Sequence, residues 1–303
     1  MAEKWFNNNL SKSNLHSYTK RHLLKTRRNG FIEWLSNLSV TGWLVLVNVI
    51  FFIIELILLT SFGQDVLYYL ALQPNAVITQ GYVWTLFTSM FSHIFLWHIF
   101  INMFVLLSFG KIAERIIGKK RFFWFYMIAG LSAGFLYVLL SYFFGTTALG
   151  ARIFGDPFTF ALGASGAVFG VLGLLAVLIP QTRVFLLAGP LIALIAQNIL
   201  RSLAPTFTLL PILDFLLTLY FFISIMALFI PSENLRKIAL FIGMPLWIAP
   251  ILAIVPLIII GLFFSLPIGN MAHLGGAISG VIYGFYLRNK YPRKTKMLSR
   301  MFS

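Results

Sequence analysis

The stretch "LGASGAVFG" (residues 162–170) places one hydroxyl, that of Ser165, at the start of an apolar segment. Apolar runs of about 20 residues, the length that crosses a bilayer as a helix, recur along the chain from residue 40 onward. Of the 303 residues, 59% are hydrophobic and only 10% are charged. The sequence therefore predicts an all-α fold, a polytopic helical bundle in a membrane.

The formal net charge is +15, and the cations are concentrated in 4–28, 111–121 and 288–300. These stretches flank apolar segments, which is typical of cytoplasmic loops facing anionic lipid. The charge therefore indicates the lipid bilayer and not nucleic acid as the partner, with both termini cytoplasmic. No organelle-targeting segment is apparent, so a prokaryotic plasma membrane is the default expectation. The absence of cysteine excludes disulfides and a cysteine nucleophile.

Hydropathy and the positions of the cations predict eight spans. The spans are 40–62, 94–112, 122–144, 164–180, 184–203, 207–230, 239–264 and 268–288. Between the first two lies a mostly uncharged segment, 63–92, which we expect to be an outer, partly embedded loop. A re-entrant hairpin is the alternative for 184–230, because Arg201 would otherwise lie in an outer turn.

Ser165 and His273 form the first candidate pair. Glycines follow the serine at 166, 170 and 173, and glycines 276, 280 and 284 recur every fourth residue after the histidine. Helices with such bare faces approach closely, which allows a short serine side chain to reach an imidazole on its neighbour. An imidazole there can take the hydroxyl proton and later protonate a leaving amine. No acidic residue stands at an obvious orienting position, so the pattern predicts a dyad.

His98 and Asn102 share one face of the second span, because they are four residues apart. Both side chains can donate hydrogen bonds to a negative oxygen. Ser165 begins its helix, where backbone N–H groups and the positive end of the helix dipole also favour a developing oxyanion. Taken singly, Asn102 would be explained as a hydrogen-bonding residue between helices, and His98 as a buried histidine with its hydrogen bonds satisfied. Together with Ser165 and His273, they indicate a catalytic site.

With these residues the chain resembles the rhomboid family of intramembrane serine proteases. The matching elements are, in order, the run of His93, His98 and Asn102, then Glu114, "GASG" at 163–166 and "AHLGG" at 272–276. The resemblance implies that Ser165 is the nucleophile and His273 the general base. It further implies an oxyanion hole formed by His98, Asn102 and the backbone N–H of Ser165.

Five further residues receive supporting roles from the resemblance: His93, Gly163, Phe169, Glu114 and Gly276. Glu114 would be structural and tie the second span to the basic loop. Phe169 stands where many members carry a tyrosine beneath the histidine, and we expect stacking of its ring to suffice. In the first outer loop, where the family often has Trp-Arg, Trp84 is followed by Thr85, so any role of that arginine is lost.

The interval from Ser165 to His273 is much longer than one intervening helix requires. The resemblance then implies a six-helix core with a helical hairpin inserted between core spans four and five. The predicted units are a basic cytoplasmic arm (1–39), the core (40–183 and 239–288), the inserted hairpin (184–238) and a basic cytoplasmic tail (289–303).

The implied activity is hydrolysis of peptide bonds in or near transmembrane segments of membrane-protein substrates, with no metal and no cofactor. The alternatives are an inactive relative that binds membrane proteins, and a transporter. Two acids in apolar segments, Glu55 and Asp214, favour the transporter weakly; we expect Glu55 to have a polar partner and Asp214 to bond within the hairpin. Zinc-protease motifs and a glycine-flanked aspartate pair are absent from the sequence.

Overall fold

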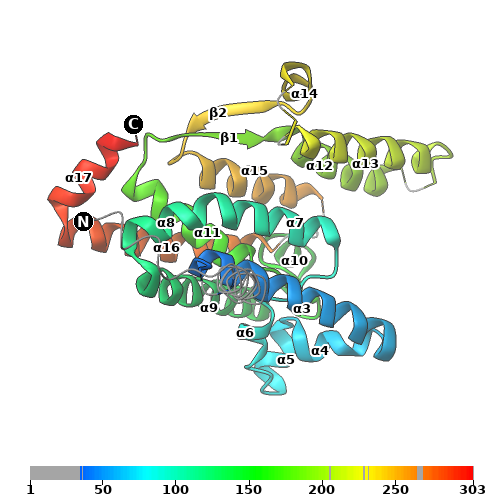
Figure 1. Cartoon of the computed structure of the whole chain (residues 1–303). Helices are drawn as coiled ribbons and strands as arrows, with labels where there is room; N and C mark the ends of the chain where they lie inside the picture. Colours follow the sequence, from blue (N-terminus) through cyan, green and yellow to red (C-terminus); the bar gives the residue numbers. More distant parts are fainter. Residues whose placement is uncertain are drawn as a thin grey trace, which may run out of the picture.

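A computed structural model describes residue 35 and residues 37–302 apart from 205, 228, 231 and 265–268. The predicted arm 1–39 lies almost wholly outside this part of the chain, as do His16 and His22. What is described is mostly helical, with helices packed side by side (Figure 1). The all-α prediction needs one correction, a two-stranded sheet.

The first predicted span is helix α3, Val40–Phe62. The side chain of Ser39 caps it by accepting a hydrogen bond from the Gly42 N–H, 3.1 Å long. One stripe of the helix is buried, and its members recur every third or fourth residue: Thr41, Leu44, Asn48, Phe52 and Glu55. The other faces expose large apolar side chains, as a helix in lipid does. The first span is therefore confirmed as an apolar helix of spanning length.

The predicted loop 63–92 folds as four short helical segments. They are η1 (Gln64–Val66), α4 (Leu67–Leu70), α5 (Pro74–Thr79) and α6 (Thr85–Thr88). The Trp84 indole donates to the Tyr69 carbonyl at 3.1 Å, and Leu72 forms an isolated antiparallel bridge with Ala161. These bonds satisfy backbone groups that a loop near lipid could not leave unpaired.

Two further helical segments are long and apolar enough to cross a membrane, 96–117 and α9 (Lys119–Phe144). The first consists of α7 (Leu96–Val105), a π-helical turn η2 (Leu106–Gly110) and α8 (Lys111–Ile117). In the described residues, α3, 96–117 and α9 are the helices that meet this criterion. α10, Ala148–Phe154, follows in the next loop.

The centre of the molecule is the pair formed by α11, Ser165–Leu178, and α16, Asn270–Lys290. Both pack against α9 (Figure 1). Ten of the 14 residues of α11 are buried, so this short helix is enclosed by protein and not by lipid.

Residues expected to begin two spans are instead strands. β1, Arg183–Leu187, pairs antiparallel with β2, Phe241–Pro245. Short apolar runs fit strand and helix alike, and a helix through 239–264 would hold Pro245 in its interior at a cost of about 3 kcal/mol. The helices therefore start later: α12 at Ala188–Leu203 and α15 at Ala249–Phe263. Pro250 lies in the first turn of α15, where proline is tolerated.

Helices α12 and α13 (Leu210–Met226) pack together and project from one side of the molecule (Figure 1). Arg201 on α12 forms an ion pair of 2.9 Å with Asp214 on α13. The Gln197 amide donates to the Asp214 carbonyl oxygen and to the Thr218 hydroxyl, each at 2.9 Å. The expectation that Asp214 bonds within this segment is confirmed. Short α14, Glu233–Ile238, leads on to β2.

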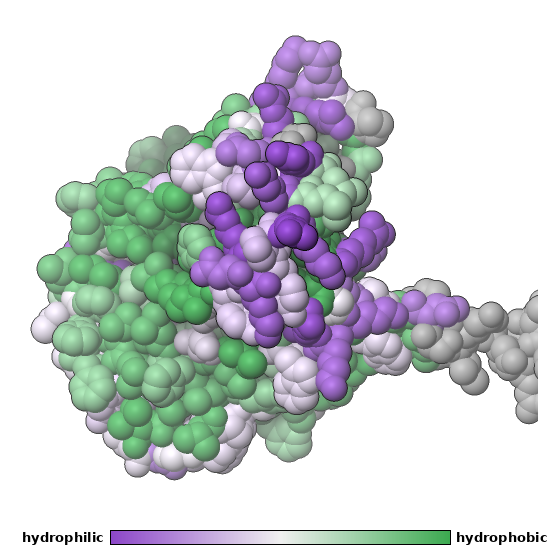
Figure 2. Space-filling model, turned by 90° about the vertical axis from the view of Figure 1, so that its left-hand side faces the viewer, coloured by the Kyte–Doolittle hydropathy of each residue, from purple (hydrophilic) through white to green (hydrophobic). Residues whose placement is uncertain are grey.

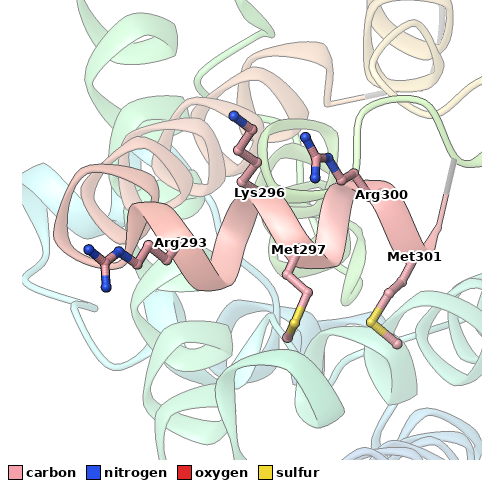
Figure 3. Close-up of a pocket in the computed structure, with 5 residues that line it drawn as sticks. All are labelled: Arg293, Lys296, Met297, Arg300 and Met301. Atoms are coloured by element: carbon pink, nitrogen blue, oxygen red, sulfur yellow. The ribbon is translucent and has the colours of Figure 1, made fainter.

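The predicted basic tail forms helix α17, Pro292–Met301, at the opposite end of the molecule from α12 and α13. Figure 2, which faces this end, shows hydrophilic side chains gathered over one part and hydrophobic side chains over much of the rest. Lys296 and Arg300 point to one side of α17, and Met297 and Met301 to the other (Figure 3). This two-sidedness is typical of a helix at a membrane surface.

Candidate active site

The structure brings Ser165 and His273 into contact. The Ser165 hydroxyl oxygen and His273 Nε2 share a hydrogen bond of 2.9 Å. Ser165 is the first residue of α11, and His273 lies in the first turn of α16. Among the described residues His273 Nδ1 has no hydrogen-bond partner. Ser165 and His273 therefore form a hydrogen-bonded pair, and no described carboxylate bonds to the other imidazole nitrogen.

Glycines make this contact possible because they allow the two helix backbones to touch. A Cβ atom at Gly276 would overlap the carbonyl oxygen of Gly166, and one at Gly280 would overlap that of Gly170. Any side chain at these positions would push α16 away from α11. The glycine spacing predicted this close approach, and it is confirmed.

The Phe169 ring stacks on the His273 imidazole, with centroids 4.4 Å apart and planes inclined by 20°. Phe169 lies one turn after Ser165 on α11, so a single helix supplies both the hydroxyl and the surface on which the imidazole rests. The ring thus lies against the imidazole; that stacking suffices without a tyrosine hydroxyl stays a prediction.

The turn before Ser165 passes close to His98. Gly163 has a φ of +118°, and a Cβ there would lie 2.7 Å from His98 Cε1. Its N–H donates to the Ser89 carbonyl oxygen at 2.8 Å. Glycine is thus required at 163 for two reasons, a left-handed backbone and the nearby imidazole.

Asn102 and His93 form a buried network beside this turn. His93 Nε2 accepts hydrogen bonds from the Asn102 amide at 3.1 Å and from the Ala164 N–H at 3.3 Å. Since Nε2 accepts, the ring hydrogen is assigned to Nδ1, which donates to the Phe91 carbonyl at 3.2 Å. Burial lowers the pKa of His93, which keeps this loop imidazole neutral. Thus His93 joins the second span to the residue preceding Ser165.

Glu114 has a different partner from the predicted one. Its carboxylate accepts hydrogen bonds from the Val40 N–H at 3.0 Å, the Thr41 N–H at 2.8 Å and the Thr41 hydroxyl at 2.7 Å. A carboxylate at a helix N-terminus satisfies its free N–H groups and opposes the positive end of its dipole. By these bonds Glu114 ties α8 to the beginning of α3 and not to the basic loop.

Glu55 is the residue whose surroundings the sequence did not reveal. Its side chain is fully buried, and it accepts hydrogen bonds from the Ser92 hydroxyl and from the His93 N–H, the latter 2.8 Å long. The expectation of a polar partner is confirmed, but its identity was hidden because the partners are distant in sequence. The available signal was its place on the buried stripe of α3, seven residues after Asn48.

The arrangement has the parts of a nucleophilic hydrolase site: a hydroxyl, a neighbouring base, and donors around a helix start. The described residues contain no group of three or more His, Cys, Asp or Glu side chains that could hold a metal ion.

Comparison with known proteins shows the family of the chain. A family model described as "Rhomboid domain" matches residues 80–233 and 218–290, well over half of the chain. Human "Presenilin-associated rhomboid-like protein, mitochondrial" is 30% identical over 176 residues, which cover 56% of this chain and 42% of the relative. "Rhomboid protein 1, mitochondrial" of Saccharomyces cerevisiae is 34% identical over 122 residues, covering 39% of this chain and 33% of the relative. "Rhomboid protease GluP" of Bacillus subtilis is 35% identical over 115 residues, covering 38% and 20%.

The matched region thus spans less than half of the length of each of these relatives. Two of the three carry "mitochondrial" in their names. The comparisons therefore give no support to the expected prokaryotic plasma membrane. Together with the apolar helices, they identify an integral membrane protein.

Proposed function

The chain belongs to the rhomboid family, and from this premise we propose that it is an intramembrane serine protease acting through Ser165 and His273. The observation that carries the proposal is the 2.9 Å hydrogen bond between the Ser165 hydroxyl and His273 Nε2. The proposed substrates are membrane proteins cleaved in or near a transmembrane segment. No metal or cofactor takes part in the proposed reaction.

In the first half of the proposed reaction, His273 Nε2 takes the Ser165 proton as the serine oxygen attacks the scissile carbonyl carbon. The carbonyl oxygen becomes an oxyanion. Collapse of this intermediate breaks the C–N bond, and the imidazolium gives its proton to the leaving amine. The product is an acyl-enzyme on Ser165.

In the second half, a water molecule gives a proton to His273 and attacks the acyl carbon. The ester bond to Ser165 breaks, the serine oxygen takes the proton back from His273, and a carboxylic acid is released. The proposed donors to both oxyanions are the Ser165 N–H, His98 and Asn102. Their support is that the His98 ring and the Asn102 amide lie against Gly163, two residues before the nucleophile.

In the proposed protease, Phe169 and His93 are supporting residues. Phe169 limits rotation of an imidazole whose Nδ1 has no partner among the described residues. His93 gives the Ala164 N–H an acceptor, so the chain enters α11 in one fixed conformation.

For the architecture we propose a core of six spans, 40–183 and 239–288, with 184–238 inserted between the fourth and fifth. The pairing of β1 with β2 supports this division, because it brings the two ends of the segment together. The alternative of a transporter rested on two acids in apolar segments, Glu55 and Asp214. Each of these acids has a hydrogen-bonded partner within the protein, so neither calls for a transported ion to explain it.

The test is cleavage by the purified protein in liposomes that contain single-span substrate proteins. Wild type should cleave, Ser165→Ala and His273→Ala should each lose about 10⁴-fold or more of the rate, and a chelator should have no effect. The matched control is Ser279→Ala, which alters a hydroxyl on α16 that bonds within its own helix. Cleavage that survives Ser165→Ala would refute the assignment of the nucleophile.

A further inference from the structure

Glu55 lies in α3, the first span, away from the residues proposed for chemistry. None of its surface is exposed. Burying a carboxyl group is costly unless its oxygens find donors, and in an apolar helix such a group is uncommon without a function. Both oxygens of Glu55 have donors: the Ser92 hydroxyl on Oε1 and the His93 N–H on Oε2.

The donors belong to the turn between α6 and α7, where the backbone is not helical. N–H groups in such a turn have no partner from regular secondary structure, and in an apolar interior each needs one. Glu55 supplies the acceptor for His93 and fixes the hydroxyl of its neighbour. The turn is therefore hydrogen-bonded to α3 at His93, the residue whose imidazole contacts the candidate active site.

From His93 the connection continues in two directions. Its Nε2 accepts from the Asn102 amide on α7 and from the Ala164 N–H just before α11. The backbone of His93 is held by Glu55, and its side chain holds both Asn102 and the segment entering Ser165. A chain of hydrogen bonds thus runs from the first span to the two sides of the candidate oxyanion hole.

We propose that Glu55 is a positioning residue: through His93 it sets the place of the Asn102 amide and of the Ala164–Ser165 backbone for oxyanion binding. The inference rests on the proposed function. Glu55 touches none of the reacting atoms, so its contribution is to the rate of the chemical step and not to substrate affinity.

The experiment compares Glu55→Leu, Glu55→Gln and Asn48→Leu with wild type in liposomes, measuring kcat and KM. Leucine removes both acceptors, and we expect kcat to fall by about 100-fold, the effect of a small misplacement at a catalytic site, with KM changed less than about twofold. Glutamine keeps an oxygen for the His93 N–H and can donate to the Ser92 oxygen, so it should restore most of kcat. Asn48 lies on the same buried stripe and donates to the Leu44 carbonyl oxygen, and no described hydrogen bond joins it to the turn 89–95, so Asn48→Leu should leave kcat unchanged.

A purely structural role for Glu55 predicts different results. Leucine leaves the His93 N–H and the Ser92 hydroxyl without an acceptor, so the Glu55→Leu thermal midpoint should fall; at temperatures where the variant is fully folded, a purely structural role predicts wild-type kcat, and the positioning role predicts that the loss of kcat remains. In a double-mutant cycle, Glu55→Leu should add less than its full loss to that of Asn102→Ala, because the Asn102 amide is one of the two groups that Glu55 positions through His93. Fully additive losses, an unchanged kcat in Glu55→Leu, or no rescue by glutamine would each overturn the proposal.

Amide hydrogen exchange tests the role of Glu55 independently of whether the protein cleaves a substrate. In Glu55→Leu, amides of residues 89–95 and 163–166 should exchange faster than in wild type, while those of α9 should not change. If wild type itself does not cleave, or if Ser165→Ala still cleaves, the proposed function fails, and exchange alone then decides whether Glu55 holds the turn. Unchanged exchange at 89–95 would overturn the positioning role in either case.

Discussion

Phe169 lies flat against His273, with the two ring centroids 4.4 Å apart. In a triad, a carboxylate behind the imidazole fixes its orientation. Here the described residues give His273 Nδ1 no such partner, and the stacked ring is the contact that restricts rotation of the imidazole. In the proposed dyad, packing of this ring would take over the orienting role that a carboxylate has in a triad.

Replacing Phe169 by alanine should lower kcat. An aromatic pair contributes about 0.5–1.5 kcal/mol beyond the area it buries, so the expected loss is about two- to thirteenfold, and Phe169→Tyr should retain the rate. The measurement is substrate cleavage in liposomes, with Phe135→Ala, an exposed phenylalanine of α9, as the control. Wild-type kcat in Phe169→Ala would contradict a role for stacking.

Replacing Asn102 by alanine should lower the rate of the chemical step and leave substrate affinity nearly unchanged. Removing one donor from an oxyanion hole costs about 10²–10³-fold in kcat, and Asn102→Ala should show this loss with little change in KM. The same steady-state assay measures both constants. A rise in KM at constant kcat would instead assign Asn102 to substrate binding.

The helix contact behind the dyad should be intolerant of even one methyl group. Gly276→Ala would place Cβ against the Gly166 carbonyl oxygen, and overpacking of this kind costs about 1–3 kcal/mol. We expect a lower thermal midpoint in detergent micelles and a lower cleavage rate. Gly269→Ala is the control, because among the described residues beyond its chain neighbours the nearest atom to its added Cβ is Ala272 Cβ, 3.8 Å away; equal midpoints in the two variants would argue against close packing.

The inserted segment should be dispensable for the chemistry. Leu187 and Phe241 are paired at one end of the β1–β2 ribbon, so residues 188–240 can be replaced by Asn-Gly, a two-residue hairpin turn. The described hydrogen bonds and ring contacts of Ser165 and His273 involve no residue of 188–240. Cleavage that depends on Ser165 should therefore persist.

This deletion also uncovers part of α7. Trp97 packs edge-on against Phe221 with centroids 6.1 Å apart, and Phe229 contacts Phe100 and Phe104. We expect the choice among substrates to change more than the rate on the best one, as measured with a panel of single-span proteins. A shortened chain that folds but no longer cleaves would show that the segment belongs to the catalytic unit.

The sequence allowed a correct structural prediction where a local residue pattern determines how a helix forms or packs. Regularly spaced glycines implied that α11 and α16 touch, and that contact placed Ser165 beside His273. The first span was equally clear, because Val40–Phe62 is predominantly apolar over the length of a span, with Glu55 as its one charged residue. In these cases the determining interactions lie within one helix or on the facing surfaces of two.

The sequence was uninformative where a hydrogen-bond partner lies far away along the chain, or where an apolar run is short. Glu55 bonds to a turn 37 and 38 residues away, and Glu114 to the start of α3, 73 and 74 residues away; neither pairing has a local signature. Residues 184–187 and the strand Phe241–Pro245 fall within predicted helical spans, because short and mainly apolar runs fit either period. Their pairing depends on contacts between segments far apart in the chain.

The unequal lengths of the peripheral helices have a consequence for the surrounding lipid. At 1.5 Å per residue, α3 with its 23 residues extends about 34 Å, but α15 with its 15 residues extends only about 22 Å, against a hydrocarbon thickness of about 30 Å. Since α15 exposes apolar side chains, hydrophobic mismatch should make the bilayer thinner beside it than beside α3. For the proposed protease, acyl-chain length in the host membrane would then affect the rate, because it sets how much of an approaching substrate helix stays immersed on that side.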